Sequence, residues 1–161
     1  MLKTAPEDRT SPAAQAPQIR LTKTSPWYWR VTFDNPPLSL MGPVFVVGFG
    51  KIISAIESDE NLRVVVFDSA VEGFFLNHID LTVKMEELTA LPQGPTGLEA
   101  WPDILVRITR APVVSIAKIR ARATGNGSEI SLEIGRARAL EVLLSSEDIR
   151  GNLAQAYGYV K

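Results

Sequence analysis

Apolar residues occupy every second position in one early stretch of the chain, which predicts a half-buried β-strand. The apolar positions of that stretch are Trp27, Trp29, Val31 and Phe33. Residues 18–23 precede it and provide a partner strand for residues 26–34. Pro36 and Pro37 end the pattern, because proline donates no backbone hydrogen bond to a sheet. The first element is therefore predicted to be a strand pair.

Two later stretches are continuously apolar and rich in β-branched residues, which is typical of strands buried on both faces. They cover residues 62–67 and 113–119. Pro112 opens the second stretch, and proline is tolerated at the first residue of a strand. We predict both stretches to be inner strands.

Helical spacing of apolar residues marks several segments between and after the strands. The predicted helices are residues 41–57, 82–91, 98–109 (with Pro102 in the first turn), 136–144 and 147–157, the last stopped by Gly158. Because strands and helices alternate, we expect one α/β domain over residues 18–161, preceded by a disordered leader, residues 1–17.

Composition excludes several classes of function. The chain has 161 residues, a net charge of −1 and no cysteine. Near-neutral charge gives no basic surface for nucleic acid and no polybasic membrane patch. Thiolate chemistry is excluded, and the single histidine rules out a multi-histidine metal site within one chain. A Ser-His-Asp triad would have to use His78, which we interpret as a surface or packing residue.

The leader has no apolar core typical of a signal peptide, and its acidic Glu7 and Asp8 are unusual in a transit peptide. No segment is apolar over a length that spans a membrane. The sequence alone therefore predicts a cytoplasmic protein that associates with neither membrane nor nucleic acid.

Candidate chemistry follows the second apolar run. Gly125, Asn126 and Gly127 suit a tight turn into a helix, whose free N–H groups can hold an anion or a developing oxyanion. Glu129 lies three residues after Asn126, as in a helix capping box. One interpretation is a plain strand–helix unit in which Glu129 only caps its own helix. The other is a ligand site.

Four blocks, taken in order, resemble the crotonase family, also called the enoyl-CoA hydratases/isomerases. The blocks are residues 31–38, residues 63–67 with 75–81, residues 111–117 through 125–129, and residues 134–141 through 157–160. The second contains Phe-Leu-Asn-His-Ile-Asp-Leu and the third contains Gly-Asn-Gly-Ser-Glu. The resemblance implies a ClpP/crotonase-type spiral of repeated ββα units, here incomplete.

The resemblance also implies a site. The backbone N–H groups of Ile79 and Asn126 would form an oxyanion hole for the carbonyl of an acyl-CoA thioester, and Glu129 would be the catalytic carboxylate. Substrate contacts would come from Leu38 and Asn126 and from the segment Ile79, Asp80, Leu81 and Thr82. Coenzyme A would be part of the substrate, with no metal or separate cofactor. The family forms homotrimers or hexamers.

The chain also departs from the family pattern. Leu132 runs directly into Glu133, where the family has a long segment that carries the second catalytic carboxylate. The chain therefore resembles an internally deleted, C-terminally short crotonase. An impaired acyl-CoA enzyme and a non-catalytic remnant or assembly partner both remain open. A nucleotide-binding domain is a weaker alternative, because no phosphate loop is present beyond residues 125–127.

Two smaller predictions concern single residues. Asp80 is expected to be the N-cap of the helix that follows it. The three tryptophans, Trp27, Trp29 and Trp101, are expected to be packing residues.

Overall fold

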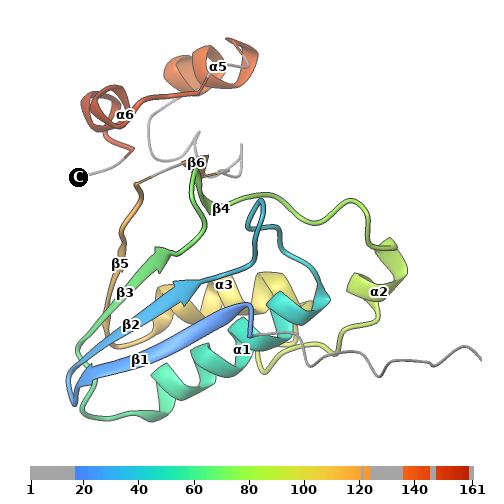
Figure 1. Ribbon diagram of the computed structural model, residues 1–161, viewed down its shortest axis with the longest axis vertical. Helices are drawn as coiled ribbons and strands as arrows, with labels where there is room; N and C mark the ends of the chain where they lie inside the picture. Colours follow the sequence, from blue (N-terminus) through green and yellow to red (C-terminus); the bar gives the residue numbers. More distant parts are fainter. Residues whose placement is uncertain (1–16, 121, 124–135, 146–147, 160–161) are drawn as a thin grey trace, which may run out of the picture.

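The computed structural model describes residues 17–120, 122–123, 136–145 and 148–159 (Figure 1). Its main sheet has the strand order β1-β2-β3-β5. These strands are β1 (Ile19–Ser25), β2 (Tyr28–Phe33), β3 (Val64–Ser69) and β5 (Val114–Ala117). β1 runs antiparallel to β2, whereas β2, β3 and β5 are parallel. The strands β4 (Phe74–Leu76) and β6 (Arg122–Ala123) form a separate parallel pair.

The order of elements repeats a strand–strand–helix unit. The first unit is β1, β2 and α1 (Pro43–Ser58), and the second is β3 and β4 followed by α2 (Met85–Thr89) and α3 (Ala100–Arg110). β5 and β6 begin a third, and α5 (Arg136–Ser145) and α6 (Gly151–Tyr157) lie farther along the chain. This repetition confirms the predicted α/β fold of ββα units.

The hydrophobic core lies between the sheet and the helices α1 and α3, which cover the same face of it (Figure 1). Phe33 is its centre, with ring centroids 5.5–6.2 Å from four other phenylalanines. These are Phe45, Phe49, Phe67 and Phe75. Burying each large apolar side chain contributes roughly 1.5–3 kcal/mol, so this cluster is a main source of stability.

A buried ionic network connects the two core helices. Arg107 of α3 donates to both carboxylate oxygens of Glu57 on α1, with its Nε 3.0 Å from Oε1, and its Nη1 lies 3.1 Å from Asp103 Oδ2. Asp103 is 2% exposed and also accepts from the backbone N and the Oγ1 of Thr96. The network therefore ties α3 both to α1 and to the loop before it.

The structure corrects the prediction that residues 113–119 are a buried inner strand. β5 is an edge strand, with Val114 60% and Ile116 46% exposed. It pairs with β3 on one side, and none of the described strands pairs with the other side. β-branched composition favours a strand but does not show whether a neighbour covers it.

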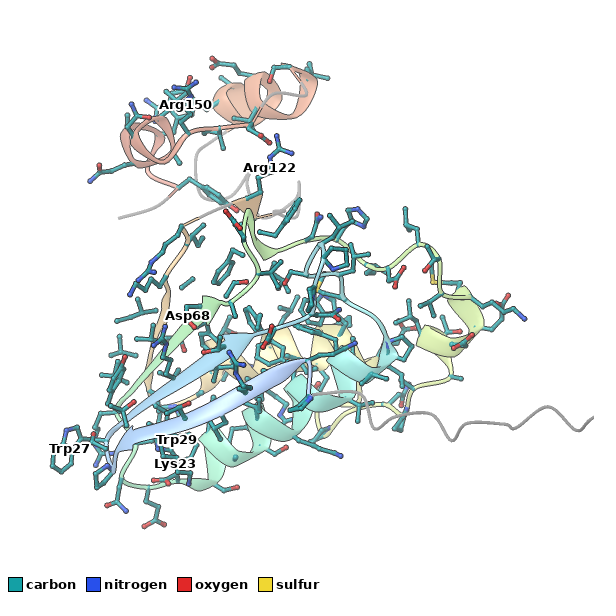
Figure 2. All side chains as sticks on the ribbon, in the orientation of Figure 1. Lys23, Trp27, Trp29, Asp68, Arg122 and Arg150 are labelled. Atoms are coloured by element: carbon teal, nitrogen blue, oxygen red, sulfur yellow. The ribbon has the colours of Figure 1, made fainter. Side chains whose placement is uncertain are left out.

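Two further predictions are wrong in detail. Trp27 is 61% exposed and lies at the tip of the β1–β2 hairpin, away from the core, whereas Trp29 is buried beneath Lys23 (Figure 2). Asp80 caps no helix, because α2 begins only at Met85. The other helices agree with prediction to within a few residues, and Gly158 ends α6 with a left-handed φ of 85°.

Residues 1–16, the greater part of the predicted leader, lie outside the described residues. In the described part of the chain, no helix combines the length and apolar character needed to cross a membrane.

Candidate active site

The loop after β4 is held against the start of α1 by a single backbone bridge. Met41 N donates to His78 O over 3.1 Å, and Asp80 N donates to Met41 O over the same distance. Asn77 N additionally donates to Ser39 O over 3.0 Å. These three hydrogen bonds join backbone atoms and hold residues 77–80 against residues 39–41.

This bridge leaves the N–H group of Ile79 unpaired among the described residues. In a parallel pairing of this kind, Met41 makes both bonds to the residues on either side of Ile79, so the N–H of Ile79 is directed away from Met41. Its carbonyl accepts from Nδ1 of His78 over 2.6 Å. A free, fixed N–H is the kind of donor that an oxyanion hole requires.

Ile79 lies on the wall of a large apolar cavity. The cavity has a volume of about 700 Å³, which is within the range of small-molecule sites. Core aromatics, α3 and the strands β5 and β6 provide most of its lining, including Phe33, Phe49, Phe67, Phe75, Trp101, Leu105, Ile108, Ala117 and Ala123. The polar side chains on its wall belong to Asn77, His78 and Tyr159. Such a cavity suits an apolar group attached to one polar atom that accepts a hydrogen bond.

The predicted substrate-binding residues divide between two hollows. Ile79 and Leu81 line the large cavity, whereas Leu38 and Asp80 line a neighbouring one of about 240 Å³. Thr82 adjoins Asp80: its Oγ1 and its backbone N donate to Asp80 Oδ1 over 2.6 and 2.9 Å. The side-chain hydrogen bond from Thr82, followed by the backbone one, holds the pKa of Asp80 below its ordinary value.

Sequence reasoning missed the residues that position this loop. Ser39 is fully buried, has a left-handed φ of 54°, and donates from Oγ to Phe75 O over 3.2 Å. Asn35 Nδ2 donates to Leu40 O over 2.7 Å and closes the same turn. Pro36 and Pro37 mark the end of the strand in the sequence, but the attachment of the following turn to β4 depends on long-range contacts that a local pattern does not encode.

The remaining predicted site residues, Asn126 and Glu129, lie outside the described residues. None of the described residues lining the large cavity is an aspartate or a glutamate. The described residues also contain no group of three or more acidic or histidine side chains able to hold a metal ion.

Comparisons with known proteins agree with this architecture. The chain is 30% identical over 120 residues to mouse enoyl-CoA hydratase domain-containing protein 2, mitochondrial, an alignment that covers 73% of this chain and 40% of the mouse protein. The fold matches that of a Streptomyces avermitilis protein with a TM-score of 0.76 at 22% identity, over 89% of this chain and 66% of the other. The chain belongs to the crotonase (enoyl-CoA hydratase/isomerase) family.

Solved structures of two further enoyl-CoA hydratases share the fold of this chain. The enoyl-CoA hydratase of Geobacillus kaustophilus matches with a TM-score of 0.73 at 18% identity, over 91% of this chain and 68% of that one. That of Bacillus anthracis matches with a TM-score of 0.72 at 17% identity, over 89% and 68%. No family model matches the chain. This crotonase chain spans less than half the length of its mouse relative. The internal deletion between Leu132 and Glu133 remains a prediction, because both residues lie outside the described part of the chain.

Proposed function

We propose that this crotonase-family chain binds an acyl-CoA thioester, with the acyl group in the apolar cavity and the thioester carbonyl at Ile79. The observation that carries the proposal is the N–H of Ile79, which has no partner among the described residues and is fixed by the Met41 bridge on the wall of that cavity. The carbonyl oxygen accepts this N–H and the N–H of Asn126. As negative charge develops on the oxygen, both hydrogen bonds strengthen.

Glu129 has the role of moving a proton to or from the substrate, or of activating a water molecule. Hydration in this family uses a pair of carboxylates, and the sequence provides one candidate. We therefore propose that the chain binds substrate weakly and is impaired in turnover. Coenzyme A is part of the substrate, and the chain uses no separate cofactor.

Calorimetric titration with butyryl-CoA, which has no double bond to hydrate, tests the binding. Ile79→Pro removes the N–H without breaking a hydrogen bond between described residues. One hydrogen bond contributes about 0.5–1.5 kcal/mol, so butyryl-CoA affinity should fall about 2- to 10-fold. Ile79→Ala keeps the N–H and controls for the lost side chain.

Free coenzyme A, which lacks the thioester carbonyl, should bind Ile79→Pro and Ile79→Ala equally well. If Ile79→Pro weakens coenzyme A and butyryl-CoA by the same factor, Ile79 does not hold the carbonyl. If neither ligand binds the unaltered chain, the acyl-CoA proposal is wrong.

A second candidate function is that of a non-catalytic assembly partner. It is favoured by the lack of any carboxylate among the described residues of the cavity wall. The calorimetric result separates the two candidates, since a pure assembly partner needs no thioester site.

A cytoplasmic location is also part of the proposal, although the mouse relative carries the word mitochondrial in its name. Fractionation of cells that express a C-terminally tagged chain would test it, with recovery in the mitochondrial fraction as the contrary result.

A further inference from the structure

None of the described residues covers the outer edge of the strand β5. The backbone groups of Val114, Ile116 and Lys118 are directed towards β3, as the 2.8 Å bonds from Val114 N to Arg63 O and from Lys118 N to Phe67 O show. The groups of Ser115 and Ala117 therefore point to the other side, where no described residue accepts or donates. Figure 1 shows β5 at the margin of the sheet.

Natural edge strands are usually blunted by a charge, a proline or a bulge. β5 has the sequence Val-Ser-Ile-Ala and pairs with β3 without a register shift, so none of these devices is present within it. On the sheet face opposite the helices, Val64 and Val66 lie beside Val114 and Ile116 in register. The outer backbone edge thus continues into an apolar row in which Val114 and Ile116 are exposed and Val64 and Val66 are half-buried.

We propose that β5 is a self-association edge, at which a second copy of this chain pairs antiparallel about a two-fold axis at Ile116. The proposal does not depend on acyl-CoA binding. In this register Ser115 of one copy lies opposite Ala117 of the other, and the two exchange both backbone hydrogen bonds. The two main sheets then form one continuous sheet, and every outward group of Ser115 and Ala117 is paired.

The side chains favour a second copy in this arrangement. Ile116 lies opposite its own symmetry mate at a site without backbone hydrogen bonds, where Cα atoms approach to about 4.5 Å and side chains touch. The apolar row then runs unbroken from Val66 through both isoleucines to the other Val66. Each Lys118 lies opposite Val114 of the other copy. The two lysine side chains therefore start about 13 Å apart along the strands, a distance greater than the Debye length at physiological salt, so their charges repel little.

Sedimentation velocity of the full chain tests the pairing, and a dimer is the expected result. Ile116→Lys and Ile116→Glu, each alone, place like charges opposite one another and should give monomers. An equimolar mixture of the two should restore the dimer, because only a two-fold axis at this position juxtaposes Lys and Glu. Val47→Lys on α1 is the matched control, at a position 41% exposed against 46% for Ile116, and should remain dimeric.

Because the chain has no cysteine, a single introduced thiol provides an independent measurement. The expected Cα separation fits a disulfide, so Ile116→Cys should oxidise to a covalent dimer, whereas Val47→Cys should not. A monomeric unaltered chain overturns the proposal, as does a larger assembly insensitive to both charge substitutions. Capture of a different extended peptide at β5, with no Ile116→Cys dimer, also overturns it.

Discussion

Position 94 accommodates only glycine, because a buried carboxylate occupies the space of a side chain. A Cβ atom placed on Gly94 would lie 1.9 Å from Cγ of Asp103. Asp103 cannot retreat without giving up its bonds to Thr96 and Arg107. Gly94 lies in a run rich in proline and glycine, residues 92–97, and this local composition does not show that Asp103 of α3 approaches it so closely.

Gly94→Ala should therefore destabilise the fold by roughly 2 kcal/mol, a typical cost of overpacking a buried site. Chemical denaturation measures the change in the free energy of unfolding. Gly48→Ala is the control of opposite sign: it lies within α1 with nothing within 4 Å of the new Cβ, so it should stabilise by about 0.5–1 kcal/mol. Equal effects of the two substitutions would contradict the packing at Gly94.

The roles of individual residues in the candidate site could be predicted only in part. Ile79 could be assigned from the family pattern, but its free N–H results from a bridge to Met41, which lies 38 residues earlier in the numbering. Aspartate is a common N-cap residue, but the carboxylate of Asp80 accepts its hydrogen bonds from Thr82, within a turn and not at the start of a helix. Glu129 and Asn126 remain predictions.

Among the elements, α3 is connected to α1 by ionic contacts as well as by apolar packing. Burial raises the pKa of Asp103, but the hydrogen bonds from Thr96 and Arg107 outweigh it, so the pKa lies below its ordinary value. A carboxylate with a lowered pKa in the folded state contributes stability in full above its unfolded pKa of about 3.9, and the contribution is lost as pH falls below that value.

Asp103→Asn should therefore lower the free energy of unfolding near pH 7 by roughly 2–3 kcal/mol, because it leaves Arg107 with one ionic partner. The difference from the unaltered chain should shrink below about pH 4. Urea denaturation over a pH series measures both effects. A difference that stays constant down to pH 2 would show that Asp103 contributes packing rather than charge.

Element types were predictable because periodicity and proline placement reflect local physics, and the boundaries of α1, α3 and β2 follow the pattern closely. Exposure was not. The run Val114–Ala117 has the composition of an inner strand, but whether a strand is covered depends on which neighbours the topology provides.

For the whole molecule, we expect no measurable hydration of crotonyl-CoA. A positioned acid or base contributes about 10²–10⁴ in rate, and one member of the family pair has no counterpart in the sequence. The absorbance of crotonyl-CoA follows the reaction, with an intact enoyl-CoA hydratase as the positive control. Turnover that disappears in Glu129→Gln would show that one carboxylate suffices. Turnover that survives Glu129→Gln would show that Glu129 only caps its helix.

Isotope-edited infrared spectroscopy measures directly whether the Ile79 N–H polarises a bound thioester carbonyl, as we propose. Butyryl-CoA labelled with ¹³C at the carbonyl should show its carbonyl band displaced to lower frequency when bound to the unaltered chain and to Ile79→Ala. In Ile79→Pro, at ligand concentrations that restore occupancy, the displacement should shrink, because one donor is gone. An unchanged displacement in Ile79→Pro, or no displacement in the unaltered chain, would show that the Ile79 N–H does not polarise the carbonyl.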